Sequence, residues 1–206
     1  MLHLETIDTE TLELLNQLMQ IKEFDQLNLV GGTSLALQIG HRKSIDLDLF
    51  GQFNLDEYQF VTILKQFASL KQLNQTANIK TFLLNHIKVD FVNYPYQWLE
   101  PNLMINGIRL ATIKDIAAMK LAAITGRGTK KDFIDIYFLL DYYTLAEMFK
   151  FYQKKFPDGS EFMVIKSLMY FGDAEKDPLP VMLKEINWDD IKTKIISETK
   201  TFLDTH

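Results

Sequence analysis

The pattern of apolar residues changes once, near Thr112, and this change most limits the folds that are open to the chain. Before it, apolar and polar residues alternate with a period of two, as in residues 44–50 (SIDLDLF), which indicates half-buried strands. After it, capping pairs such as Thr112 with Asp115 introduce stretches with helical spacing only. The sequence therefore predicts an α/β half with a mixed sheet, followed by a helical bundle.

The two halves are expected to be domains that pack against each other. We place an α/β domain at residues 1–110 and a helical domain at 111–206. No Pro-, Ser- or Gly-rich spacer separates them near residues 106–111. Tight packing between the halves would favour a site between them.

Local signals predict the individual elements. Asn54 with Glu57 is expected to cap a helix, and Asn85-His86 to form a tight hairpin turn. Strands are predicted at residues 27–30, 44–50, 79–84, 87–92 and 105–110. Helices are predicted at residues 9–24, 33–40, 54–69, 112–124, 130–140, 144–156, 161–170 and from 187 to the C-terminus.

Composition excludes several classes of function. The formal net charge of −5 argues against a chain that coats nucleic acid or anionic membrane non-specifically. With no cysteine, disulfides and thiolate zinc sites are impossible, and the four histidines lack metal-ligand spacing. No apolar run approaches the roughly 18 residues of a membrane helix, and no signal peptide is visible. We expect a soluble, cytoplasmic protein that does not enter the membrane.

The densest chemical signal lies in residues 30–50, where a strand ends at Gly31-Gly32. Glycine lets the backbone turn sharply and approach a ligand closely. Thr33 and Ser34 then open a short helix, whose first N–H groups and dipole favour phosphate. The purely structural alternatives are a tight turn at the glycines and an ordinary helix cap at Thr33 or Ser34.

Two carboxylates follow on the next strand. The period of two places Asp46 and Asp48 on one strand face, with the core-facing residues on the other. Carboxylates beside a phosphate-binding turn suit magnesium (Mg2+), which prefers oxygen ligands and is shared with substrate phosphates. Asp90, in the apolar strand IKVDFV, is placed as a third ligand. The residues expected to face the core are Ile45, Leu47 and Leu49.

These charged residues could also have no role in binding a ligand. Asp46 and Asp48 alone could be a solvated strand face, and Asp90 could be a strand-edge charge. Arg42 and Lys43 precede the acidic strand, and they could contact phosphate, form structural ion pairs or be loop charges.

Four segments in this order resemble the AbiEii-type nucleotidyltransferase toxin family of bacterial abortive-infection and toxin–antitoxin systems. The family belongs to the DNA polymerase β-type nucleotidyltransferase superfamily. The similarity covers about residues 28–140 and is looser over 141–206. The segments are GGTSLAL, HRKSIDLDLF, KVDFVNYP and KLAAITGRGTKKDFIDIYFLL.

The resemblance implies roles for particular residues. Asp46 and Asp48 would bind magnesium, and Gly32, Thr33 and Ser34 would contact phosphate. Essential roles are also implied for Lys120, Lys131, Asp132 and Asp135.

A charge argument links the two halves. A triphosphate and acidic metal ligands need nearby cations, and the helical half supplies Lys120, Arg127, Lys130 and Lys131. We therefore predict that Lys120 and Asp135 share one site with Asp46 and Asp48. The alternative is that KKDFID is ordinary helix charge patterning. The histidines His41 and His86 are expected to be structural or exposed.

The leading functional hypothesis is magnesium-dependent transfer of a nucleotide from an NTP to RNA, such as tRNA. The resemblance adds growth arrest as the cellular effect and a possible cognate antitoxin as partner. Two alternatives remain open. One is transfer to a protein or a small molecule, and the other is a non-catalytic module that binds NTP.

Overall fold

The computed structural model describes residues 1–205, which divide into two compact units. The sheet unit comprises residues 1–39, 44–95 and 102–111, and the helical unit comprises residues 40–43, 96–101 and 112 onward. The first is built on a mixed sheet and the second on helices alone, so the predicted fold class is confirmed.

A seven-stranded sheet forms the centre of the sheet unit, in the order β3-β4-β5-β2-β1-β7-β6. Strand β2 runs antiparallel to β1 and parallel to β5, so the sheet is mixed. The strands are β1 (Asn28–Val30), β2 (Leu47–Gly51), β3 (Leu70–Gln75), β4 (Ile79–Leu84), β5 (Ile87–Asn93), β6 (Leu103–Ile105) and β7 (Ile108–Leu110).

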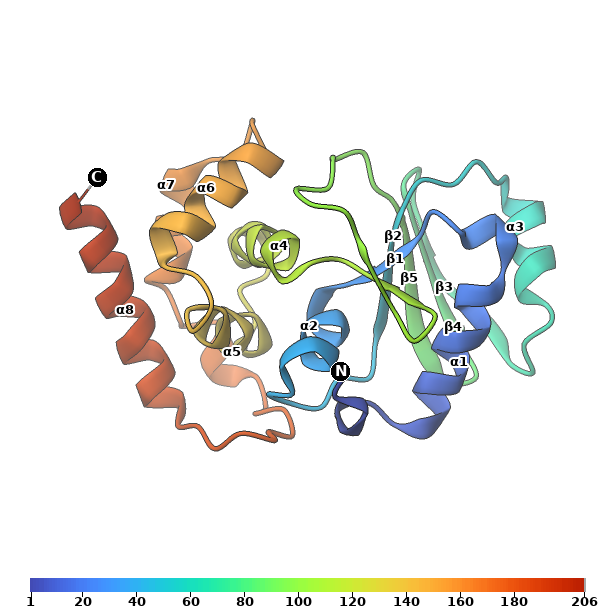
Figure 1. Ribbon diagram of the computed structural model, residues 1–206, viewed down its shortest axis with the longest axis horizontal. Helices are drawn as coiled ribbons and strands as arrows, with labels where there is room; N and C mark the ends of the chain where they lie inside the picture. The colour runs from blue at the N-terminus through green and yellow to red at the C-terminus, as the bar shows by residue number, and fades with distance from the viewer. Residues whose placement is uncertain (206) are drawn as a thin grey trace. The chain divides into compact units, whose positions relative to one another are not determined.

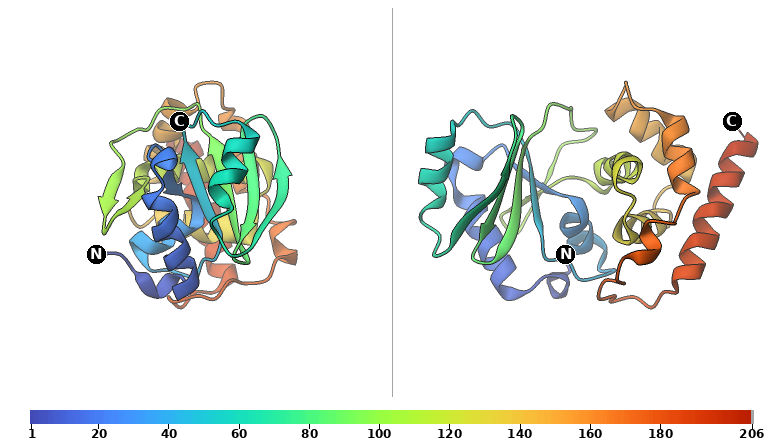
Figure 2. Two further views of the ribbon diagram at one scale, coloured as in Figure 1. Left: turned by 90° about the vertical axis from the view of Figure 1, so that its right-hand side faces the viewer. Right: turned by 180° about the vertical axis from the view of Figure 1, so that it is seen from behind.

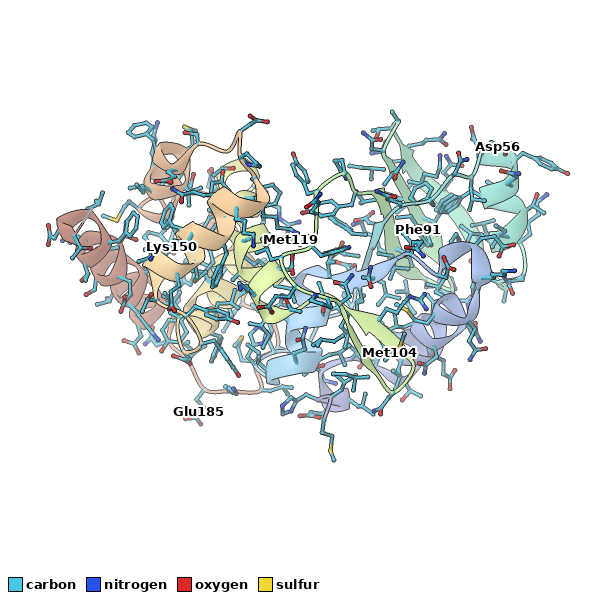
Figure 3. The ribbon with its side chains drawn as sticks, turned by 45° about the horizontal axis from the view of Figure 1, so that its top comes forward. Asp56, Phe91, Met104, Met119, Lys150 and Glu185 are labelled. Atoms are coloured by element: carbon cyan, nitrogen blue, oxygen red, sulfur yellow. The ribbon has the colours of Figure 1, made fainter. Side chains whose placement is uncertain are left out.

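Helices cover both faces of this sheet. Figure 1 shows α1 (Thr9–Gln20) and α3 (Glu57–Leu64) on one face and α2 (Gly31–Ile39) on the other, and Figure 2 shows the same layers from two more sides. Four odd-numbered residues of β2 and β5 are at most 1% exposed in the core on the α1–α3 side, namely Leu47, Leu49, Val89 and Phe91. Figure 3 shows Phe91 in the interior of the unit. Even-numbered residues of both strands therefore point to the opposite face.

Five helices build the helical unit around α4. Helix α4 packs against α5, α6 and α7, and α8 closes the bundle against the same three helices. None of the helices between residues 1 and 205 has both the length and the apolar character that crossing a membrane needs. The helices are α4 (Ile113–Gly126), α5 (Lys130–Leu139), α6 (Leu145–Lys155), α7 (Glu161–Leu168) and α8 (Trp188–Thr205).

Local signals placed most of these elements correctly. The Thr112 hydroxyl caps α4 by accepting a hydrogen bond from the Asp115 N–H. Asn85 and His86 both have positive φ, as a two-residue hairpin turn between β4 and β5 requires.

Three elements of the sheet unit differ from the prediction. Helix α3 begins after Asp56, which forms the capping box with Gln59 in place of Asn54 with Glu57. Residues 105–110 are not one strand, because Asn106-Gly107 turns the chain and makes a hairpin of β6 and β7. Strand β3 was not predicted, because its mainly exposed sequence LKQLNQ has no apolar alternation.

Candidate active site

Helix α2 begins at Gly31, directly after β1, two residues earlier than predicted. Gly31 has a φ of +67°, and a Cβ atom there would lie 2.2 Å from Oδ2 of Asp48. Two separate features therefore require glycine at this position, namely the positive φ and the closeness of the Asp48 carboxylate. The start of α2 and the acidic strand thus meet at Gly31.

The hydroxyls of Thr33 and Ser34 are buried and already bonded. Thr33 Oγ1 shares a hydrogen bond of 2.8 Å with Ser44 Oγ and donates another to the Asp46 carbonyl. Ser34 Oγ accepts from Gln38 Nε2 at 3.1 Å. Thr33 therefore ties the start of α2 to the chain at Ser44 and Asp46, whereas Ser34 is bonded within α2. The groups of this turn that suit phosphate are its first main-chain N–H groups.

Asp48 and Asp90 lie side by side on the sheet face opposite the α1–α3 core. They are direct partners in the parallel pairing of β2 with β5. Asp46 lies one residue before β2, and Ile45 is 56% exposed, so the prediction that Ile45 faces the core was wrong. The reason is that Ser44, just before it, hydrogen-bonds to the chain near the N-terminus through its N–H and leaves the strand ladder.

Lys88 brings an ammonium group into this acidic face, and sequence reasoning missed it. Its Nζ lies 2.5 Å from Oδ2 of Asp90, two positions further along β5. Burial alone would lower the pKa of Lys88, but the hydrogen bond to Asp90 and the charges of Asp90, Asp48 and Asp46 raise it. The period of two in IKVDFV places Lys88 on the face of Asp90, so the signal was present.

The donor set fits a divalent cation. Asp90 Oδ1 is buried and has no hydrogen-bond partner within residues 1–205, so one carboxylate oxygen is left to bind an ion. Asp48 beside it adds further hard oxygen donors. Across residues 1–205, no three His, Asp or Glu side chains are already grouped as a metal site.

A buried ion-pair network in the helical unit is centred on Asp135 of α5. Its carboxylate accepts from Arg42 Nε at 2.8 Å and Nη2 at 2.9 Å, and from His41 Nε2 at 2.8 Å. Lys120 Nζ lies 2.6 Å from its Oδ2. Asp135, His41, Arg42 and Lys120 are all at most 3% exposed. Arg42 therefore forms the structural ion pair that was one of its expected roles.

Asp132, one turn before Asp135, completes the network. It accepts from Lys120 Nζ at 2.9 Å, Arg127 Nε at 3.0 Å and Thr129 Oγ1 at 2.7 Å. Lys120 thus bridges the two carboxylates of α5. The charges of this helix are paired internally, in contrast to those of a solvated helix face.

The network holds its groups in fixed protonation states. Burial would raise the pKa of Asp132, but Lys120 and Arg127 hold it at about 2. Burial would likewise raise the pKa of Asp135, and Arg42 and Lys120 hold it well below its ordinary value. Burial lowers the pKa of His41 more than the hydrogen bond and the charge of Asp135 raise it.

The remaining predicted cations of this region differ in exposure. Lys130 is buried and donates to the carbonyls of Asp177 and Glu175. Lys131 is exposed, and the side chain of Arg127 is 63% exposed. Of the four cations that the helical half was predicted to supply, Arg127 and Lys131 are exposed.

Comparison with known proteins decides the family. A family model described as the nucleotidyl transferase AbiEii toxin of a type IV toxin–antitoxin system matches residues 13–205. The chain belongs to the AbiEii nucleotidyltransferase toxin family. Its resemblance to the family is thereby confirmed and extends through the helical half, and the enzyme class is nucleotidyltransferase.

A relative in sequence and two solved structures match nearly the whole chain. An uncharacterized protein of Aquifex aeolicus (strain VF5) is 32% identical over 201 residues, which cover 95% of this chain and 97% of that one. The structure of JHP933 from Helicobacter pylori has a TM-score of 0.59 and 18% identity, and the match covers 95% of this chain and 92% of the other. MenT4, a nucleotidyltransferase toxin of Mycobacterium tuberculosis H37Rv, has a TM-score of 0.57 and 15% identity, covering 94% and 86%. At these identities the two structures show a shared fold.

The predicted site residues of this AbiEii-family chain thus form two groups. Asp48, Asp90 and Gly31 belong to the sheet unit, whereas Lys120 and Asp135 belong to the helical unit. That the two groups make one site stays a prediction.

Proposed function

We propose that this nucleotidyltransferase moves a nucleotide from an NTP to an RNA acceptor such as tRNA, with magnesium bound at the acidic face of its sheet. The observation that carries the proposal is the in-register pair of Asp48 and Asp90 beside the start of α2 at Gly31. Carboxylates at a helix start combine a cation site with a phosphate site, which is what NTP chemistry needs.

The residues of the sheet unit have distinct roles in this proposal. Asp46, Asp48 and Asp90 would hold the ion, which supplies stabilisation of charge on the transferring phosphate and of the attacking hydroxyl. The main-chain N–H groups of Gly31 and Gly32 would orient the phosphate chain. Lys88 adds a positive charge to the same face and offsets the negative charge of its carboxylates.

Lys120, Asp132 and Asp135 act in this proposal as positioning residues. Their network fixes His41 and Arg42, only four residues before Asp46 in the chain. The segment that enters the acidic strand is therefore fixed by buried ion pairs. Lys120→Ala is expected to lose nucleotide affinity and Asp135→Ala to lose turnover.

The RNA acceptor and the antitoxin complete the proposal. The formal net charge is −5, so an RNA acceptor needs a local cationic surface, and Arg127 and Lys131 are exposed cations that suit one. The family description places these proteins in a type IV toxin–antitoxin system, so a cognate antitoxin is the proposed partner.

The test is incubation of the purified protein with labelled NTPs, magnesium and total tRNA or cell extract, followed by gel separation. We expect label in an RNA band. Asp46→Ala and Asp48→Ala should abolish the label while both variants keep the circular dichroism spectrum of the wild type. Full activity of either variant at ordinary magnesium concentration would rule out the assignment of these carboxylates.

The same gel separates the alternatives. Label in a protein band would assign transfer to a protein side chain. Retained NTP binding without any labelled product would assign a non-catalytic NTP-binding module. Loss of label in RNA when EDTA replaces magnesium, with recovery on adding magnesium back, supports the role of the metal.

A further inference from the structure

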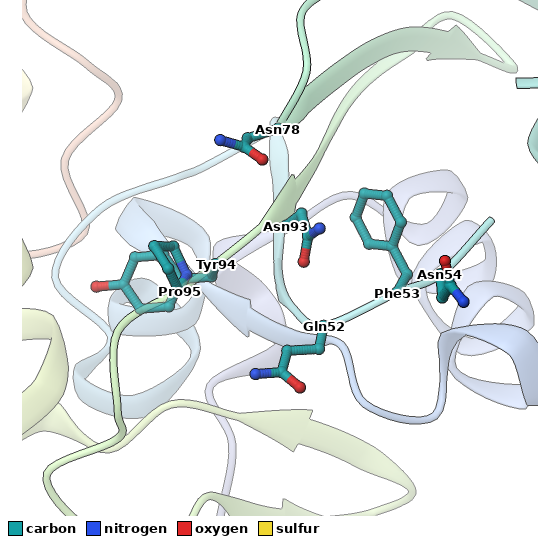
Figure 4. Close-up of a pocket in the computed structure, with 7 residues that line it drawn as sticks. All are labelled: Gln52, Phe53, Asn54, Asn78, Asn93, Tyr94 and Pro95. Carbon is teal, nitrogen blue, oxygen red and sulfur yellow. The ribbon is translucent and has the colours of Figure 1, made fainter. Parts of the chain in front are cut away.

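Two cavities within residues 1–205 differ in their chemistry. The larger, of about 580 Å³, lies at the ends of β2 and β5, and the side chains that line it are all uncharged (Figure 4). It lies off the acidic face, because Asn93 is three residues from Asp90 on β5 and Phe53 packs on Phe60 of α3. The smaller, of about 160 Å³, lies in the helical unit and has charged side chains of both signs.

Two segments of the helical unit form the walls of this smaller cavity, which we call the α4–α7 pocket. One wall is the end of α4 with the loop after it, residues 124–128, and the other is α7 with the turn after it. The second wall presents Met163, Lys166, Ser167 and Tyr170, whose spacings of three or four residues place them on one helix face. Pockets for whole small ligands measure about 300–1,000 Å³, so this pocket suits one part of a larger molecule.

Each wall supplies one cation. The side chain of Arg127 is 63% exposed, and its Nε and Nη2 contact the Asp132 carboxylate at 3.0 and 3.1 Å, which fixes the direction of the guanidinium. Lys166 is exposed, and its ammonium forms no ion pair within residues 1–205. The carbonyls at the end of α4 carry partial negative charge, so these two side chains must supply the attraction for an anion.

The Tyr170 ring gives the pocket an exposed aromatic surface. It is 59% exposed, although it is a large ring. Gly172 makes room for it, because a Cβ atom there would lie 2.8 Å from Tyr170 Oη and 2.9 Å from its Cζ. The ring therefore lies against the main chain at Gly172 while remaining open to solvent. Such a ring is a surface on which a nucleobase can stack.

One acid, Asp173, completes the charges of the pocket. Its carboxylate forms no ion pair among the described residues, although Lys166 lines the same pocket. Two cations and one acid leave one net positive charge, which matches the single charge of a phosphodiester and falls short of that of a triphosphate. A carboxylate can also accept a hydrogen bond from the 2′-hydroxyl of a ribose.

We infer that the α4–α7 pocket binds one nucleotide of the acceptor RNA, with its phosphate between Arg127 and Lys166 and its base on Tyr170. The inference rests on the proposed function and gives its RNA acceptor a binding site on the helical unit. Cations for the backbone together with an aromatic ring for a base are the means by which proteins bind single-stranded nucleic acid. The acceptor is therefore expected to enter the pocket as a single strand.

The test measures binding of a fluorescein-labelled single-stranded RNA 12-mer to the full-length protein, by fluorescence anisotropy at several salt concentrations. The pocket variants are Lys166→Ala, Tyr170→Ala and Tyr170→Phe. The matched controls are Lys200→Ala, which removes an exposed lysine of α8, and Tyr142→Ala, which removes a ring that is 49% exposed. Thermal unfolding by circular dichroism checks that every variant is folded.

The two pocket residues should fail in different ways. Lys166→Ala should weaken binding and lower the slope of log affinity against log salt by about 0.7, the value for one phosphate contact on a single strand. Tyr170→Ala should bind about tenfold more weakly with an unchanged salt slope. Tyr170→Phe keeps the ring and should bind like the wild type, as should both controls.

Two results would overturn the inference. The first is wild-type RNA binding, with the wild-type salt slope, in either Lys166→Ala or Tyr170→Ala. The second is loss of ATP binding in these variants, measured by calorimetry with magnesium, while RNA binding is kept. That result would assign the pocket to the donor nucleotide.

The outcome is distinguishable from failure of the proposed function. If the wild type labels RNA while the pocket variants bind RNA normally, the inference fails and the function stands. If the variants lose RNA binding as expected while the wild type yields no labelled product, the pocket stands and the transferase proposal fails.

Discussion

At the scale of single residues, the acidic face depends on Gly31, which has no side chain, and on Lys88, which carries a positive charge. Gly31 lacks a side chain, which leaves room for the Asp48 carboxylate at the start of α2. Lys88 supplies a cation to Asp90, the neighbouring carboxylate. Both positions act on the same pair of acids, one by space and the other by charge.

Replacing Gly31 tests the role of space. Gly31→Ala should lower the free energy of unfolding by about 1–2 kcal/mol for the left-handed backbone, and by roughly 1–3 kcal/mol more for the contact with Asp48. Gly107→Ala is the control, because its φ is +80° but nothing lies within 4 Å of the added Cβ. Urea unfolding and transfer activity are the measurements. Equal losses in both variants would show that the approach of Asp48 to Gly31 is unimportant.

Replacing Lys88 tests the role of charge. Lys88→Met removes the ammonium that contacts Asp90, so magnesium added without NTP should bind about fivefold more tightly, as the loss of roughly 1 kcal/mol of competition predicts. The measurement is the rise in melting temperature during a magnesium titration. Lys71→Met, which removes an exposed lysine of β3, should titrate like the wild type. A Lys88→Met titration curve identical to that of the wild type would contradict a shared site.

At the scale of elements, α5 organises the helical unit through buried charge. Its two carboxylates, Asp132 and Asp135, bind cations from α4 and from the segment at residues 40–43. Burying ions costs free energy, and the cost is offset only while every charge keeps its partner. Helix α5 therefore holds these cations in one arrangement, and removing any one partner should destabilise the fold.

Removing one partner of the network should therefore be costly. Asp135→Ala leaves Arg42 and Lys120 buried without their shared carboxylate, and a loss of about 3–5 kcal/mol of unfolding free energy is expected. Glu100→Gln is the control, because Glu100 pairs with Lys114 at the surface and should cost less than about 1 kcal/mol. Denaturant unfolding checks both, and a loss near 1 kcal/mol in Asp135→Ala would refute the structural role.

Lowering the pH should weaken the same ion-pair network and reduce the stability of the protein. The pKa of Asp132 falls from 3.8 to about 2 on folding, so the unfolded chain binds its proton first as the pH drops. Its contribution is present above pH 4 and is lost between about pH 4 and pH 2. The wild type should therefore lose about 2 kcal/mol of unfolding free energy relative to Asp132→Asn between pH 4 and pH 2. Chemical unfolding at pH 5, 4, 3 and 2 measures the gap, and a constant gap would contradict the ion pairs.

At the scale of the whole chain, neither unit is continuous in sequence. The helical unit contains residues 40–43 and 96–101 from within the α/β half. The first of these segments supplies Arg42 to Asp135. The second is held by Lys155, whose Nζ contacts the Gln97 carbonyl at 3.0 Å and Asp115 at 2.6 Å. The helices therefore depend on residues that precede them by up to about a hundred positions.

A fragment of residues 112–206 should consequently fail to fold alone. It lacks Arg42 and His41, so Asp135 would keep only Lys120 as a charged partner in the core. We expect non-cooperative thermal unfolding by circular dichroism and poor dispersion of amide resonances. A cooperative transition at the melting temperature of the intact chain would show that the helical half is self-sufficient.

The sequence by itself determined the local structure. Hydrogen bonds between residues three positions apart fix the caps at Thr112 and Thr144, and the turn at Asn85-His86 follows from residue type alone. The period of two fixed which face of β2 carries Asp48. These features depend on contacts within a few residues, so the sequence contains everything that decides them.

The tertiary structure alone decided the pairing across the chain. It set the register that places Asp48 beside Asp90, gave Arg42 to Asp135, and made a strand of the polar residues 70–75 by pairing them with β4. Each of these depends on which distant segment supplies the missing partner for a backbone group or a charge. Which segments pair is decided by the burial of the whole core, so it cannot be predicted from a local sequence pattern.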